Sequence, residues 1–249
     1  MVDSHCHIDL YPNPENMLKQ IEKSGIFTIG VTYIPSHYKI AKRYVRKLNY
    51  IRMAVGLHPL LTNKHTQNEL QLFQKCVGET SYIGEIGLDG SKEGRAKLSL
   101  QIDSFYYVLK LINDRPRFIS VHSRDAEEQV LNGLIENNII NAVFHWYSGP
   151  RELIDDIIEH NYWFSINPAM IRSSRGQKLI KYIPKERILT ESDGPFIKIG
   201  NRVVQPQDVN KCIEYLAIKW GMSIYETEEQ IKTNFFKIID SIKAGRFSK

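Results

Sequence analysis

The sequence predicts an α/β fold, a (β/α)8 TIM barrel with a site at the carboxyl ends of its strands. Short, β-rich apolar runs alternate with amphipathic segments along the chain, and there are eight such runs. No Gly-rich phosphate loop follows the first run, which weighs against the runner-up, a nucleotide-binding doubly wound sheet. The length of 249 residues suits one domain spanning residues 1–249.

The eight expected strands are short, and several are almost wholly apolar, as strands covered on both faces are. They span residues 2–4, 27–32, 51–56, 82–85, 118–121, 142–144, 162–166 and 188–190. Apolar residues three or four apart predict helices over 40–48, 98–112, 130–135, 153–158, 209–220 and 231–242. We expect Gly25 to end the first helix and Ser36 to cap the second.

The composition is that of a soluble globular protein, with 42% hydrophobic and 24% charged residues. A net charge of +5 allows a polyanionic substrate but does not require one. The three cysteines, Cys6, Cys76 and Cys212, form no CxxC pair, which favours a reducing compartment. The N-terminus is polar and no apolar run approaches about 18 residues, so we expect a cytoplasmic protein without a membrane span.

Polar side chains recur where the expected strands end. Six of the eight strands end in or near such a residue, and the set is His5, His7, His58, Glu85, His122, His145 and Asp193. Each residue taken alone has an ordinary interpretation as a turn, a cap or a packed core residue. Because the carboxyl ends of parallel barrel strands meet on one rim, the recurrence predicts a shared pocket. His37, His65 and His160 fall between strands and are expected at the surface.

These residue types suit divalent metal ions. Neutral imidazole and carboxylate bind Zn²⁺, Mn²⁺ or Mg²⁺. His5 and His7 are two residues apart in a strand, so both can face one ion, and Glu85 can bridge to a second. Two ions about 3.5–4 Å apart activate a water and stabilise the attacking and leaving oxygens of a phosphoryl group. The pattern therefore predicts a hydrolase with two divalent metal ions.

Six segments in order resemble the TatD-type metal-dependent deoxyribonucleases of the amidohydrolase superfamily. They are DSHCHID (3–9), GLHP (56–59), GEIGLD (84–89), VHSR (121–124), HWYSG (145–149) and TESDGP (190–195). The resemblance implies two metal sites that share Glu85. The first would add His5, His7 and Asp193, and the second would add His122 and His145.

The resemblance also implies catalytic roles. Asp193 would accept the proton of the attacking water, and His58 would face the phosphate. Arg124 and Asp89 would orient ligands or neutralise phosphate charge, with an ordinary rim salt bridge as the alternative. Two loops depart from the family pattern. The loop of residues 90–94 is short, and the loop of residues 196–206 is short and has Gln205 before Pro206. Both loops would line the cleft, so the substrate's length and polarity stay open.

Residues 9–14 (DLYPNP) are similar to the TatD-like nucleases of the Qat anti-phage defence system, which implies a bacterial protein beside other Qat-type defence proteins. The basic residues expected near the rim are Arg124, Arg151, Arg172, Arg175, Lys198 and Arg202. Three aromatic residues, Trp146, Tyr147 and Phe196, are expected to stack on bases. A single-stranded DNA end fits a barrel mouth better than duplex does, which favours an exonuclease.

Two other functions stay open. An amide or ester hydrolase, such as a D-aminoacyl-tRNA deacylase, would keep the metals and change the bond. Many barrels of that kind carry a carboxylated lysine at the end of strand four, where this chain has Glu85. A non-catalytic DNA-binding component of a defence complex is the third function, although a structural role would not need a water-accessible two-ion site.

Overall fold

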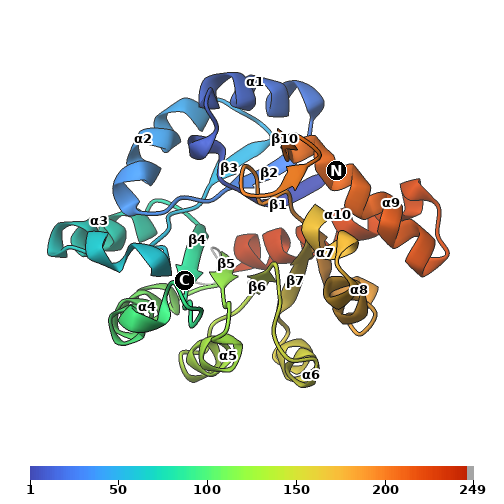
Figure 1. The fold of residues 1–249 in the computed structure, drawn as a ribbon. Helices are drawn as coiled ribbons and strands as arrows, with labels where there is room; N and C mark the ends of the chain where they lie inside the picture. The colour runs from blue at the N-terminus through green and yellow to red at the C-terminus, as the bar shows by residue number, and fades with distance from the viewer. Residues whose placement is uncertain (246–249) are drawn as a thin grey trace.

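The computed structural model describes residues 1–245 and has the (β/α)8 barrel architecture that the alternating pattern predicts. Parallel strands lie at the centre and helices surround them (Figure 1). The barrel strands are β1 (Val2–Cys6), β2 (Phe27–Gly30), β3 (Ile51–Met53), β4 (Tyr82–Gly87), β5 (Phe118–His122), β6 (Ala142–His145), β7 (Trp163–Ile166) and β8 (Ile188–Thr190). Their side chains are buried almost throughout, as expected for strands with a packed interior and helices outside.

The barrel wall consists of two hydrogen-bonded sheets, β1–β2–β3 and β4–β5–β6–β7–β8. A parallel bridge between Val55 and Ile83 joins the sheets at one seam, where the Gly84 N–H donates to the Val55 carbonyl at 2.9 Å. At the other seam, between β8 and β1, side-chain hydroxyls take the place of a ladder. The Thr190 hydroxyl donates to the Val2 carbonyl at 2.5 Å, and the Ser4 hydroxyl donates to the Thr190 carbonyl at 3.0 Å.

This seam makes Thr190 a stabilising residue. We expect Thr190→Val to lower the free energy of unfolding by about 1–3 kcal/mol, because a buried carbonyl loses its donor. Urea denaturation measures the change. Thr227→Val is the matched control, since Thr227 is also fully buried but its hydroxyl has no hydrogen-bond partner among the described residues. Equal losses for the two variants would contradict the role of the Thr190 hydroxyl.

Helices surround the strands. Six follow β1 to β6 in turn: α1 (Pro14–Ser24), α2 (Pro35–Val45), α3 (Gln67–Val77), α4 (Leu98–Ile112), α5 (Glu127–Glu136) and α6 (Glu152–Glu159). Two short helices, α7 (Pro168–Arg172) and α8 (Ser174–Ile180), connect β7 to β8. A hairpin of β9 (Lys198–Ile199) and β10 (Arg202–Val203) follows β8, and α9 (Val209–Trp220) and α10 (Ile224–Ala244) complete the described chain.

The two expected helix boundaries have different outcomes. Gly25 ends α1 in the left-handed region at φ 68°, as predicted. The prediction that Ser36 caps the second helix is wrong, because α2 begins at Pro35 and its N-cap is Ile34. Proline suits the first helical position, where no N–H is needed. The Ser36 N–H instead donates to the carboxylate of Glu69 on α3 at 3.0 Å.

Helix α10 covers the amino ends of the strands and lies behind them in Figure 1. The ring of Phe235 lies 6.2 Å from those of Phe27 and Phe118, the first residues of β2 and β5. The Asn234 amide donates to the carbonyl of Ile188, the first residue of β8, at 2.8 Å. The carboxyl ends are therefore the open side of the barrel. Among residues 1–245, no helix has both the length and the apolar character that a membrane crossing requires.

Candidate active site

A cavity of about 480 Å³ opens at the carboxyl ends of the strands. The predicted site residues that line it are His7, His58, Glu85, Asp89, His122, Arg124, His145 and Asp193. His5 is completely buried directly beside them. Side chains that are distant in sequence thus meet in one place because they lie at or beyond the ends of parallel strands.

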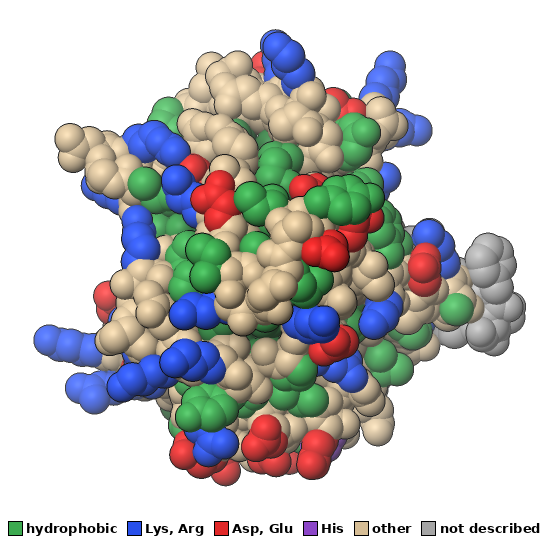
Figure 2. Space-filling model, turned by 90° about the vertical axis from the view of Figure 1, so that its right-hand side faces the viewer, with side chains coloured by type: hydrophobic (Ala, Val, Ile, Leu, Met, Phe, Trp, Pro, Cys, Tyr) green, Lys and Arg blue, Asp and Glu red, His purple; other side chains and the backbone are tan. Residues whose placement is uncertain are grey.

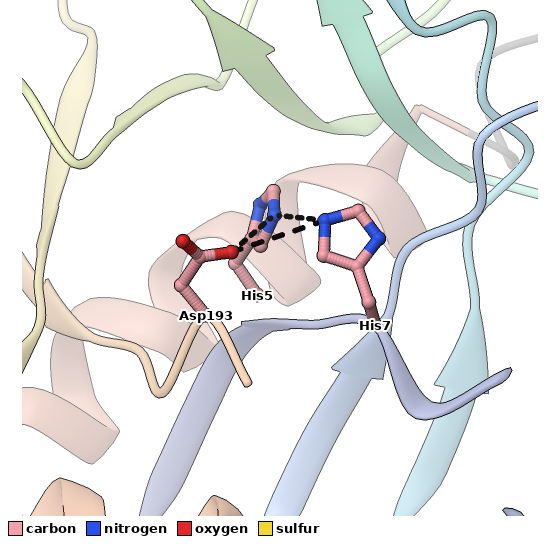
Figure 3. Close-up of side chains that lie close together, drawn as sticks. All are labelled: His5, His7 and Asp193. Carbon is pink, nitrogen blue, oxygen red and sulfur yellow. Dashed lines mark hydrogen bonds and ion pairs between the residues drawn. The ribbon is translucent and has the colours of Figure 1, made fainter. Parts of the chain in front are cut away.

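One group in this cavity consists of His5, His7 and Asp193 (Figure 3). The Nε2 atoms of the two imidazoles lie 3.2 Å apart, and they lie 3.6 Å and 3.8 Å from Asp193 Oδ1. The Asp193 N–H donates to the His5 carbonyl at 3.0 Å, which attaches the segment after β8 to β1. Asp3 strengthens this attachment, since its carboxylate accepts the Ser192 N–H at 2.8 Å. The backbone therefore holds these three donors together.

Glu85 lies at the centre of the imidazoles. Its Oε1 lies 2.6 Å from His122 Nδ1 and 2.9 Å from His145 Nε2. Its Oε2 lies 3.2 Å from His7 Nε2, 3.3 Å from His58 Nε2 and 3.6 Å from His5 Nε2. Each carboxylate oxygen thus faces its own set of imidazoles, which is the arrangement that a bridging ligand requires.

The titratable groups of the cavity are buried, and the pKa of each depends on the charges of its neighbours. Burial disfavours the charged form of Glu85, but the imidazoles of His58 and His145 outweigh it and hold the pKa of Glu85 well below its usual value. Burial would lower the pKa of His145, yet Glu85 and other acceptors raise it well above the ordinary value. Burial raises the pKa of Asp193 well above that of a free carboxyl. These three groups are therefore sensitive to any charge placed among them.

The donor set fits divalent metal ions of the transition-metal type. Imidazole nitrogens and carboxylate oxygens converge within 4.8 Å in two separate groups, one of His5, His7 and Asp193 and one of His58, Glu85 and His122. A third group, His5, His145 and Glu191, overlaps the first. The grouping of His58 with Glu85 and His122 differs from the expected second set, although His145 contacts Glu85 more closely than His58 does.

Asp89 and Arg124 lie in different environments. Asp89 is buried, and its Oδ2 lies 2.8 Å from His122 Nε2, on the opposite edge of the ring from Glu85. It is thus placed to orient His122. The Arg124 side chain is 55% exposed and lies 3.6 Å from the carboxylate of Glu93. Arg124 therefore makes the rim salt bridge that the sequence left as an alternative, while it still lines the cavity wall.

The structure adds Glu191, to which the sequence analysis assigned no role. Glu191 is completely buried, and its carboxylate accepts the Trp146 N–H at 3.0 Å and the Asn167 amide at 2.9 Å. Its Oε1 lies 3.7 Å from His145 Nδ1. Glu191 thus holds the backbone that follows His145 and faces the imidazole of His145 at ion-pair distance. Its place directly after the apolar run 188–190 was the available signal, because carboxylates after parallel strands lie on the same rim.

Two histidines, His58 and His65, do not lie where the sequence predicts. His58 does not end the third strand, because β3 stops at Met53 and His58 is the N-cap of a 3-10 helix, Pro59–Lys64. His65 is half-buried instead of lying on the surface: its ring contacts the Ser104 hydroxyl at 2.9 Å and the His58 carbonyl at 3.1 Å. An imidazole in a loop can thus hold the backbone of a site residue. The other two histidines expected at the surface, His37 and His160, are half-exposed and exposed.

Aromatic residues line the mouth of the cavity, with one exception. Trp146 and Phe196 line it as expected. Tyr147 does not, because it is 1% exposed and its hydroxyl donates to the Pro150 carbonyl at 2.5 Å, so the prediction that it stacks on bases is wrong. Tyr33, which was not anticipated, lines the cavity, and its ring lies nearly parallel to Phe196 with centroids 6.3 Å apart.

Comparisons with known proteins agree with this geometry. The TatD related DNase family matches residues 2–240. The chain is 25% identical to deoxyribonuclease TATDN3 of Homo sapiens over 98% of its length and 96% of that protein. It is 27% identical to an uncharacterized metal-dependent hydrolase of Methanocaldococcus jannaschii, over 95% and 96% of the two chains.

Solved structures show the same fold. The TatD homologue YJJV of Escherichia coli superposes with a TM-score of 0.84 at 20% identity, over 96% of this chain and 97% of that one. A TatD family hydrolase of Entamoeba histolytica superposes with a TM-score of 0.79 at 16% identity, over 96% and 97% of the two chains. The chain therefore belongs to the family of TatD related DNases and is a metal-dependent hydrolase.

Proposed function

We propose that this hydrolase cleaves phosphodiester bonds in DNA and trims single-stranded ends with the help of two divalent metal ions. The observation that carries the proposal is the position of Glu85, whose two oxygens face separate sets of imidazoles at the bottom of one cavity. The name of the human relative, a deoxyribonuclease, supports DNA as the substrate.

The metal ligands in this proposal come from opposite sides of the barrel. One ion would be held by His5, His7, Glu85 and Asp193, and the other by Glu85, His122 and His145. When bound, such ions lower the pKa of a water and stabilise negative charge on a phosphate. Asp89 and Glu191 would hold the imidazoles of His122 and His145 in place from behind.

The chain's own groups then act on water and phosphate. Asp193 accepts the proton of the attacking water, because its carboxylate lines the cavity next to the His5 and His7 imidazoles. His58 donates to a phosphate oxygen. Its Nδ1 accepts the Leu60 N–H at 3.2 Å, so the proton of the neutral ring is on Nε2. This atom lies 3.3 Å from Glu85 Oε2 at the cavity wall, where a phosphate oxygen would replace Glu85 as its acceptor.

The shape of the cavity favours a strand end over duplex. A volume of about 480 Å³ is that of a small-ligand pocket, which takes a terminal nucleotide or two and excludes a double helix. The aromatic rings of Tyr33, Trp146 and Phe196 at the mouth offer surfaces on which bases can stack, at about 1–3 kcal/mol per base.

A digestion panel tests this function. Single-stranded DNA, duplex DNA, RNA and a D-aminoacyl-tRNA, each labelled at one end, are incubated with the protein and Mg²⁺, Mn²⁺ or Zn²⁺. We expect stepwise shortening of single-stranded DNA and an intact aminoacyl ester. Release of the amino acid would instead identify an ester hydrolase, and binding of DNA without cleavage would identify a non-catalytic component.

We also propose a cytoplasmic location and a role beside Qat-type anti-phage defence proteins. Cys6, Cys76 and Cys212 are all buried and unpaired, which supports a reducing compartment.

The defence role rests on the similarity of residues 9–14 to the nucleases of that system. In cells that carry the complete defence gene set, plaque counts should fall with the wild-type chain and recover with Asp193→Asn. Equal counts would contradict the defence role.

A further inference from the structure

A second hollow of about 640 Å³ lies on the surface between the start of α6 and helix α8. We call it the α6–α8 groove. Four cationic side chains line it, against a single carboxylate, Glu152, and the four are Arg151, Arg175, Lys178 and Lys181. All of them are exposed. Figure 2 views the flank of the molecule that carries α8 and α9, and Lys and Arg side chains gather at its lower left.

The positive charge of this groove is not matched by ion pairs within the described chain. Within residues 1–245, no carboxylate lies within 4 Å of the four cationic groups, which make no ion pair. Two other arginines of the rim differ. Arg202 on the hairpin is bound by both oxygens of Asp208 at 2.6 and 2.7 Å, and Arg124 lies 3.6 Å from Glu93. The four cations of the groove are thus a group that the described carboxylates leave unpaired, whereas Arg202 and Arg124 are paired.

The groove borders the active-site cavity. Ser148 lines the cavity, and the next three residues of the chain, Gly149, Pro150 and Arg151, line the groove. The guanidinium of Arg175 donates to the Ser148 carbonyl, so a groove residue contacts the cavity wall directly. The buried Tyr147 holds this loop through its bond to the Pro150 carbonyl.

The guanidinium of Arg151 is also held in place. It lies over the ring of Tyr182, 4.1 Å from the centroid, in a cation–π contact. Tyr182 is itself 49% exposed at the groove. A cation fixed over an exposed aromatic ring, with lysines beside it, is the combination that binds phosphates and bases of a single strand.

We infer that the strand whose end is cleaved leaves the cavity across residues 148–151 and continues in the α6–α8 groove, with its phosphates against these cations. This inference rests on the proposed function, because it takes single-stranded DNA as the occupant. The inference assigns the strand to the groove and not to the hairpin, although the sequence predicted Lys198 and Arg202 on the hairpin as equally good phosphate contacts. DNA is favoured as the occupant because a polyanion compensates charges that the protein leaves unpaired.

Binding of labelled DNA tests the groove without cleavage. A fluorescein-labelled 20-nucleotide single strand is titrated with protein in a chelator, and anisotropy gives Kd at several salt concentrations. We expect Lys178→Glu/Lys181→Glu to raise Kd about tenfold or more and to reduce the slope of log Kd against log salt by about 1.4, or about 0.7 per lost phosphate contact. The control, Lys64→Glu/Lys198→Glu, changes the net charge equally at exposed positions elsewhere and should alter Kd less than about threefold.

The outcomes separate the groove from the catalytic proposal. Three results would contradict the inference that the strand lies in the groove. They are equal weakening of binding in both double variants, no weakening in the groove variant, and no binding of DNA by the wild-type protein. If the wild-type protein binds DNA through the groove but no metal supports cleavage, the proposed function is wrong and the inferred DNA-binding role of the groove is supported. Thermal unfolding of each variant checks that the fold is intact. Cleavage of a dinucleotide, which the cavity alone can hold, should be equal in the wild-type and groove variants.

Discussion

An Asp193→Asn variant should lose DNA hydrolysis by a factor of about 10²–10⁴ in kcat, the contribution of a positioned proton acceptor. The amide cannot accept a proton from water, although it keeps the shape of the carboxylate. The backbone should tolerate the change, because Asp193 has φ 46° and asparagine adopts this left-handed region readily. The rate of shortening of an end-labelled single strand measures the loss, and circular dichroism checks the fold.

Asp125→Asn is the matched control for this variant. Asp125 also has a positive φ, of 54°, and is exposed near the carboxyl end of β5. It should keep full activity. Undiminished cleavage by Asp193→Asn would exclude the proton-acceptor role. Full recovery of the variant at high metal concentration would contradict the role as well, because it would reduce Asp193 to a ligand.

Removal of divalent metal ions is expected to abolish hydrolysis and to lower the thermal stability. Ions that bind only the folded protein stabilise it by about 2.7 kcal/mol at a concentration 100 times Kd. For a chain of this length, each kcal/mol corresponds to about 2–4 °C in Tm. We therefore expect Tm to fall by about 5–10 °C after dialysis against a chelator and to recover when Mg²⁺, Mn²⁺ or Zn²⁺ is added.

Glu85→Gln should remove most of this metal-dependent rise in Tm, since both oxygens of Glu85 face imidazoles that would share the ions. Glu93→Gln is the control: Glu93 lies on the same rim but its side chain is 68% exposed, and its variant should keep the full rise. A metal-dependent rise in Glu85→Gln equal to that of the wild-type protein would argue against a bridging role. This measurement does not depend on the substrate, so it tests the metal site separately from the nuclease activity.

The fold was predictable because its signals are local. Each barrel strand is a short apolar run, and each run is followed by a helix-forming segment or a turn. The positions of His122 and His145 were predictable for the same reason, since each ends an apolar run and indeed ends β5 and β6. His58 was misplaced because its strand stops early, and the chain then continues without a ladder to a 3-10 helix. Ser36 was mistaken for a cap because proline at the preceding position already begins the helix.

Sequence patterns did not predict which side chains are buried or which charged side chains form ion pairs. Nothing in the motif HWYSG indicates that Tyr147 points into the core while its neighbour Trp146 lines the mouth. Arg151 and Arg202 appear equivalent in the sequence, but Asp208 neutralises only Arg202. Such differences depend on which side chains approach in space.

The amino-acid order alone thus determined the barrel and the residue types at its open end, because apolar periodicity and strand-end chemistry are properties of neighbouring residues. Tertiary structure alone decided that the two oxygens of Glu85 face separate sets of imidazoles, and that Glu191 and His65 support site residues from behind. It also decided that the cations of the α6–α8 groove have no ion-pair partners among the described residues. Those features arise from contacts between segments far apart in the chain, and only closure of the barrel brings such segments together.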